Sequence, residues 1–187
     1  MERRDCSGHY AGAAFRLPAG GQAARRGASA TLGDGAPMSD SILRYVPTDP
    51  FWQPSAEDAE RAAALLRSLA PKAESVESRF EDEVRFYDPG ENWSGVECNA
   101  CGADASPWWD EAMGASYASG FTQLDLVAPC CGAHVSLNDL RYGWPSAFGR
   151  FALEALNPLL ADDTTEDQDR QIGDCLGKPV RKIWVRL

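Results

Sequence analysis

The chain has 187 residues and a formal net charge of −10, which is long enough for one domain with a substantial apolar core. No stretch approaches the roughly 20 apolar residues that span a bilayer, which argues against a membrane protein. The acidic balance argues against nucleic-acid binding, which needs clustered Lys and Arg. The chain also lacks the apolar run of a secretory signal, so we expect a cytoplasmic protein whose clustered cysteines stay reduced.

The first 37 residues differ in kind from the rest of the chain. They carry five arginines against three acidic residues, and more than half of them are Ala, Gly or Arg. No helical or strand periodicity is present. We expect residues 1–37 to be a disordered basic leader or a non-native extension, followed by a single domain over residues 38–187. The alternative is a basic arm that docks on a partner.

The charge of the domain leads to a first prediction. From Met38 onward the chain carries 13 basic and 25 acidic residues. An isolated domain of this charge should not bind duplex DNA or RNA at physiological salt, because too few cations face the phosphates. Fluorescence anisotropy tests this directly. A sub-micromolar affinity would contradict the prediction and would reveal a basic patch that the composition hides.

The first elements of the domain are a helix and a strand. Ser55 with Asp58 resembles a capping box, and an apolar stripe at helical spacing runs from there to Pro71, which predicts a helix. From Val76 to Tyr87 apolar residues alternate with charged ones, which predicts a strand.

The middle of the chain predicts a second helix and strand. Ser106 as the N-cap and proline as the first helical residue begin a helix that Gly120 ends. We expect Trp109 to pack in its core and Trp108 to be half-exposed, because the apolar stripe contains Trp109, Ala112, Met113 and Tyr117. Residues 121–128 follow as a strand.

The last third predicts two helices and a strand. Pro145 begins a helix with apolar residues from Phe148 to Leu159, and residues 165–176 form a short helix that Gly177 ends, with Cys175 in the core. Residues 180–187 form a strand. We find no internal repeat and no β-α-β rhythm. The prediction is an α+β fold: a small mixed sheet with several helices and an inserted, zinc-ribbon-like pair of cysteine knuckles.

Four cysteines form two pairs, in the segments 98–102 (CNACG) and 129–132 (PCCG). In a metal knuckle the thiolate binds the ion, and the glycine after it tolerates the left-handed turn that follows. About 30 residues separate the pairs, enough for both to meet around one zinc ion. Cys98, Cys101 and Cys131 are three expected ligands.

Two residues compete for the fourth position. Cys130 would complete an all-thiolate set, whereas His134 has C-x-x-H spacing from Cys131 and would give three thiolates and one imidazole. Adjacent cysteines on one ion are geometrically awkward, which favours His134. The redox alternative for the C-x-x-C segment is weaker, because the next helix begins only at Ser106 and cannot lower the thiol pKa.

The cysteine segments, together with the run 88–94 and the stretch 136–155, resemble a group of uncharacterised bacterial proteins with a CxxCG…PCCGA zinc-ribbon-like pattern. The resemblance covers residues 44–187. It implies the extent of the domain and the four-cysteine set Cys98, Cys101, Cys130 and Cys131, without requiring the histidine. It implies no activity.

A closed thiolate site leaves no position for substrate, so we expect structural Zn²⁺ in a non-catalytic protein-interaction module whose partner is a protein. One alternative is an enzyme with structural zinc and a pocket near Asp139, Arg141, Tyr142 and Trp144. Another is an acidic, immunity-type inhibitor of a basic toxin. The segment 173–179 does not form a phosphate-binding loop, because it is too short and lacks the Ser or Thr that holds magnesium.

Overall fold

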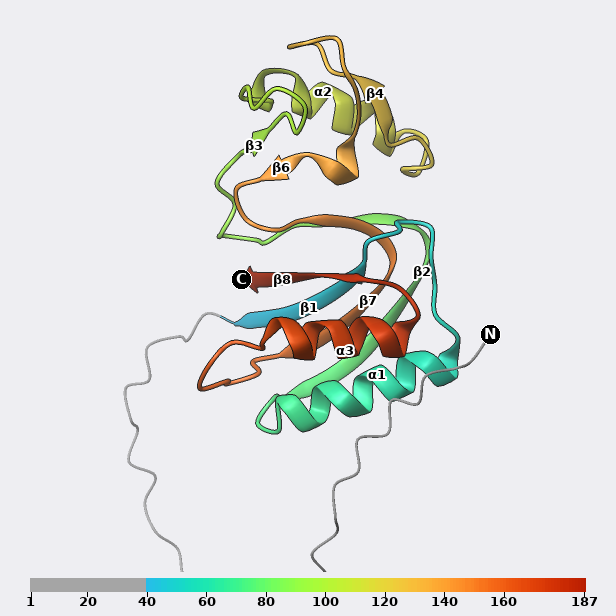
Figure 1. The fold of residues 1–187 in the computed structure, drawn as a ribbon, viewed down its shortest axis with the longest axis vertical. Coiled ribbons are helices and arrows are strands. Elements are labelled where there is room, and N and C mark those ends of the chain that lie inside the picture. The colour runs from blue at the N-terminus through green and yellow to red at the C-terminus, as the bar shows by residue number, and fades with distance from the viewer. Residues whose placement is uncertain (1–39) are drawn as a thin grey trace, which may run out of the picture. The chain divides into compact units, whose positions relative to one another are not determined.

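The computed structural model describes residues 40–187, so the expected leader over residues 1–37 lies outside the described residues. Figure 1 shows a sheet with two helices on one face and a smaller part, which contains α2, on the side away from those helices. The sheet order is β2-β7-β1-β8, and all three neighbouring pairs are antiparallel. The elements of this layer are β1 (Ser41–Pro47), α1 (Ala56–Leu69), β2 (Ser75–Tyr87), β7 (Ala147–Leu156), α3 (Glu166–Leu176) and β8 (Val180–Arg186).

This arrangement is a split β-α-β topology. Strands β1 and β2 are joined through α1 and lie parallel with β7 between them, while α3 joins β7 to the opposite edge strand, β8. It is the strand order of ferredoxin-like domains. The α+β class predicted from the sequence is confirmed.

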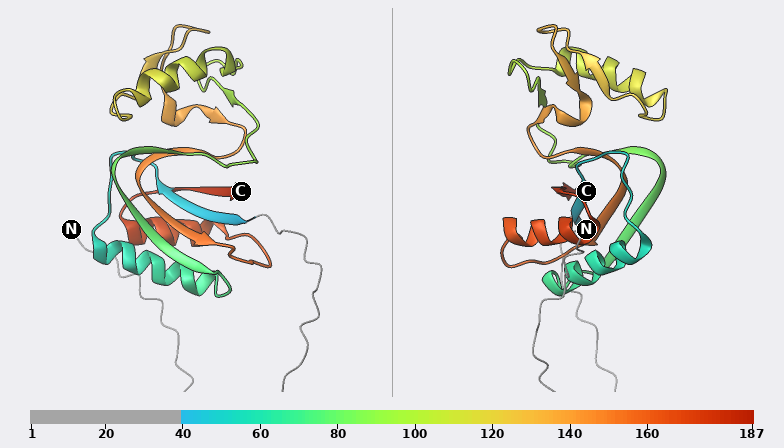
Figure 2. Two further views of the ribbon diagram at one scale, coloured as in Figure 1. Left: turned by 180° about the vertical axis from the view of Figure 1, so that it is seen from behind. Right: turned by 45° about the vertical axis from the view of Figure 1, so that its right-hand side comes forward.

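A cysteine module is inserted between the neighbouring strands β2 and β7. We use this name for residues 96–142, whose elements are β3 (Val96–Glu97), α2 (Ser106–Tyr117), β4 (Asp125–Val127), β5 (His134–Ser136), the 3₁₀ helix η1 (Leu137–Asp139) and β6 (Arg141–Tyr142). The entering strand β3 pairs with the leaving strand β6, and Gly143 N–H donates to Gly95 O over 2.9 Å. The chain therefore enters and leaves the module side by side (Figure 2).

Three apolar clusters are buried among residues 40–187, and two of them hold these parts. The first lies between the sheet and its two helices, and its large buried members include Tyr45, Leu66, Phe151 and Ile172. The second fills the cysteine module and reaches into the sheet through Val84 and Phe148. Phe148 packs against Phe86 of β2 at 4.8 Å and Phe121 of the module at 5.2 Å between ring centroids. Its side chain thus joins module and sheet.

Polar contacts reinforce the same junction. The buried Asn138 side chain, from η1, donates to Thr48 O over 3.1 Å and accepts from Phe148 N–H over 3.0 Å. Arg181 of β8 donates to Asn138 O and Ser146 O, at 2.8 and 2.7 Å. Asn138, Ser146 and Phe148 are buried, and their backbone groups would be costly to leave unpaired. The contacts therefore hold η1 against β7 and β8.

Several elements agree with the sequence prediction. Ser55 caps α1 and accepts from Asp58 N–H, as its pattern predicts. Helix α3 begins with a reciprocal capping box between Thr165 and Gln168, and ends at Gly177 in the left-handed region (φ 79°). Strands β2 and β8 and the buried position of Cys175 are confirmed.

The predicted helix from Pro145 is wrong, because residues 147–156 form strand β7. This strand is hydrogen-bonded to β2 on one side and β1 on the other, and nearly all of its side chains are buried. A central strand covered on both faces carries apolar residues at almost every position, so its sequence matches a helical stripe as well as a strand. Leu159, the last residue of the supposed stripe, is exposed.

The inner face of α2 also differs from the prediction. Trp108 is buried, at 9% exposure, and has the position expected for Trp109, which is only partly buried. Tyr117 is 70% exposed. The N-cap position of the helix is Ala105, which makes no side-chain cap, instead of Ser106. Trp108 faces the core of the cysteine module. The strand after it is shortened to β4, and β1 is an element that the sequence analysis missed.

Candidate metal centre

The first cysteine pair lies in a tight turn after β3. Cys98 N–H donates to Ala103 O over 2.9 Å, and Gly102 N–H donates back to Cys98 O over 2.8 Å. Gly102 has φ 74°, a conformation that glycine adopts without steric cost. The turn therefore needs the glycine that follows Cys101.

The second pair lies at the tip of the β4–β5 hairpin, where Val127 pairs with His134. Ala128 N–H donates to Ala133 O over 2.8 Å, and Gly132 N–H donates back to Ala128 O over 2.8 Å. Gly132 has φ 72°. This is the hydrogen-bond pattern of the first turn.

The two turns are thus a short structural repeat, although no internal repeat was expected. Cys131 has the place of Cys101, and Ala128 has the place of Cys98. The flanking pairs also correspond, since Glu97 bridges Asp104 as Val127 pairs with His134. The signal in the sequence is the triplet Cys-Gly-Ala at 101–103 and 131–133.

The turns bring four sulfur atoms together. Cys98 Sγ lies 3.9 Å from Cys131 Sγ, and Cys101 Sγ lies 3.7 Å from Cys130 Sγ. All four lie within 4.8 Å of one another. A tetrahedral zinc ion with Zn–S bonds of about 2.3 Å places its sulfurs about 3.8 Å apart. The spacing fits such an ion and is too long for disulfides, whose sulfurs are about 2.05 Å apart.

The thiols of this cluster differ in their surroundings. The N–H groups of Cys101 and Ala100 lower the pKa of the Cys98 thiol to about 7. Desolvation of the sulfur, with a contribution from the neighbouring thiols, raises the pKa of Cys130 to about 12. Four thiolates this close repel one another, so a cation is needed for all four to be deprotonated together.

The structure also places the competing ligand. His134 is exposed on β5 and does not belong to the cluster, whereas Cys130 does. Of the two alternatives for the fourth position, the structure brings only Cys130 to the other three cysteines. Adjacency is no obstacle, because the turn places Cys130 and Cys131 toward the same point.

The structure places three of the four residues proposed for an enzyme pocket on the surface. Asp139, Arg141 and Trp144 are exposed. Tyr142 packs between aromatic rings, and its hydroxyl donates to Leu137 O over 2.8 Å and accepts from Trp109 Nε1 over 3.4 Å. Burial raises the pKa of Tyr142 to about 12, so this hydroxyl stays protonated near neutral pH and serves as a hydrogen-bonding group of the core.

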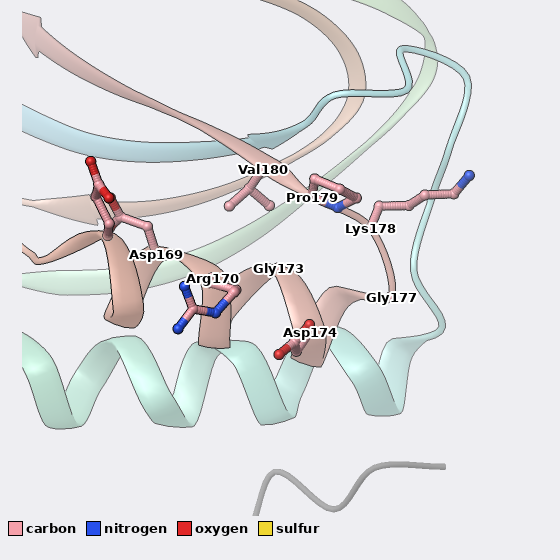
Figure 3. Close-up of a pocket in the computed structure, with 9 residues that line it drawn as sticks. Asp169, Arg170, Gly173, Asp174, Gly177, Lys178, Pro179 and Val180 are labelled. Atoms are coloured by element: carbon pink, nitrogen blue, oxygen red, sulfur yellow. The ribbon is translucent and has the colours of Figure 1, made fainter. Parts of the chain in front are cut away.

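A surface cavity of about 610 Å³ lies elsewhere, along α3 from its first turn to the residues that follow its C-terminal end (Figure 3). Gly177 caps the C-terminal end of this helix. The last carbonyl groups of the helix and the negative end of its dipole lie at this end, and both disfavour the binding of phosphate there. The lining residues are Glu166, Asp169, Arg170, Gly173, Asp174, Gly177, Lys178, Pro179 and Val180. They include no cysteine, serine or histidine for nucleophilic catalysis.

Fold and site together define an α+β domain with an inserted four-cysteine cluster that is a candidate metal site. Comparison of the chain with protein-family models, with curated proteins and with solved structures gives no match. The resemblance inferred from the cysteine pattern therefore stays a prediction. Among residues 40–187, no helix has the length and apolar character to cross a bilayer.

Proposed function

We propose that Cys98, Cys101, Cys130 and Cys131 bind one zinc ion and that this ion is structural. The observation that supports this most strongly is the convergence of four sulfurs from two turns at spacings typical of a tetrahedral site. Thiolates at all four positions leave no open position for water or substrate, as in structural zinc sites.

The construction of the cysteine module explains why it needs an ion. Its strands are two or three residues long, and hairpins of this size are marginal in water. The two turns are separated in sequence by helix α2, and they meet at the sulfur cluster and in the core beneath it. A metal ion ties them together at the point where backbone pairing ends.

For the protein as a whole we propose a non-catalytic module that binds a protein partner. Two features support this: the acidic composition, and large apolar side chains exposed on or beside the cysteine module, namely Tyr117, Val127 and Trp144. An enzyme is less well supported, because three of the four residues suggested for its pocket are exposed and the hydroxyl of the fourth, Tyr142, is bonded to the backbone.

The test is the zinc content of the full chain purified from zinc-supplemented medium. We expect close to one zinc per chain by mass spectrometry. Cys101→Ser and Cys131→Ser should each lose the ion or bind it far more weakly, because a site with three ligands opens to water. Cys175→Ala is the matched control, since Cys175 is buried in α3 outside the cluster. Metal-free wild-type protein would overturn the proposal.

A further inference from the structure

The two cysteine turns have the same backbone hydrogen-bond pattern, but their cysteines do not occupy the same positions in that pattern. Cys98 supplies the first sulfur of its turn, and the equivalent residue of the second turn is Ala128, which is likewise fully buried. Alanine has no ligand atom. The fourth sulfur comes from Cys130 instead, two residues further along and directly beside Cys131.

This displacement changes what surrounds the sulfur. Cys98 Sγ accepts hydrogen bonds from the backbone N–H groups of Ala100 and Cys101. Cys131 Sγ accepts one from Ala133 N–H. The largest influences on the pKa of Cys130 are its own desolvation and the three other thiols, whereas the largest on that of Cys98 are backbone N–H groups. Donors of this kind hold a metal ligand in place, and losing them typically weakens metal binding by about 10- to 100-fold.

Exposure acts in the same direction. Cys98 is buried, whereas Cys130 is exposed at the tip of the hairpin. Cys101 and Cys131 are also exposed, but each occupies the regular position before the glycine of its turn. Of the four cysteines, Cys130 alone is an exposed residue that also lies outside the repeated positions of the two turns.

We infer that Cys130 is the exchangeable ligand of the centre, at which an incoming small thiol or chelating ligand enters. This rests on the proposed zinc site. In the exchange with a thiol, the bond between the ion and Cys130 breaks and a bond to the incoming sulfur forms. The proton of the incoming thiol passes to Cys130, and no electrons are transferred.

The first test is the order of alkylation in the zinc-loaded full chain. A limited amount of iodoacetamide is added, and the modified residue is located by tandem mass spectrometry, which separates Cys130 from Cys131. We expect Cys130 to be modified first within the cluster. Equal or faster modification of Cys101 or Cys131 would overturn the inference.

The second test moves the fourth thiol into the regular position of the turn. The double variant Ala128→Cys/Cys130→Ala should bind one zinc and release it to a chromogenic chelator about tenfold more slowly than wild type. The matched control, Ala128→Ser/Cys130→Ala, has nearly the same shape without the thiolate and should not recover zinc binding. Release from the first variant as fast as from wild type would contradict the inference.

The two proposals fail in different ways. Wild-type protein without zinc would overturn the structural zinc site. Wild-type protein with one zinc, but with its exposed cysteines alkylated at equal rates, would leave that site standing and would overturn only the role of Cys130.

Discussion

Removal of the metal should loosen the cysteine module while the sheet and its two helices stay folded. Structural zinc in small peptides contributes roughly 10–16 kcal/mol of apparent binding free energy, comparable to the stability of a whole domain. Here the layer formed by the sheet, α1 and α3 has its own buried core, which does not depend on the cysteines. We therefore expect a loss of several kcal/mol, concentrated in residues 96–142.

Hydrogen exchange followed by mass spectrometry measures this region by region. After chelation, peptides of the two cysteine turns should exchange much faster, and peptides of α1 and β7 should change little. Re-addition of zinc should restore protection, which controls for irreversible damage. Uniform loss of protection across the domain would contradict the prediction, as would unchanged exchange in both turns.

Phe148→Ala should be among the most destabilising single substitutions in the domain. The side chain is fully buried and contacts Phe86 of the sheet and Phe121 of the module. Replacing a buried phenylalanine by alanine costs about 3–5 kcal/mol through lost burial and the cavity left behind. Urea denaturation should show this as a lower free energy of unfolding. The variant should also hold the cysteine module less firmly against the sheet, because the Phe148 ring packs against both.

Phe51→Ala is the matched control. Phe51 lies in the segment between β1 and α1 and is 50% exposed, so the same change of side chain removes little buried surface. We expect an effect within about 0.5 kcal/mol, as is usual for surface positions. A similar loss in the free energy of unfolding for both variants would mean that Phe148 does not stabilise the contact between the module and the sheet.

The candidate site was largely predictable, because its signal is local. A cysteine pair followed by glycine predicts a turn with positive φ, and Gly102 and Gly132 have that conformation. The choice between Cys130 and His134 was not local, since both have reasonable spacing from Cys131. Only the folded hairpin separates the two in space: His134 enters strand β5, whereas Cys130 lies at the tip with the other three cysteines.

The same division holds for the fold. The sequence by itself determined α1 and α3, because each carries its own cap and an amphipathic stripe, and it determined β2, whose charged residues alternate with apolar ones. Only the tertiary structure made β7 a strand. Its sequence pattern also fits a helix, and its backbone N–H and C=O groups are paired by the neighbouring strands β2 and β1. The tertiary structure also decided that residues 88–146 interrupt one hairpin and conceal the split β-α-β order. Caps and periodicity act between residues a few positions apart, whereas strand pairing joins β1 to β7 across about 110 residues and leaves no local pattern.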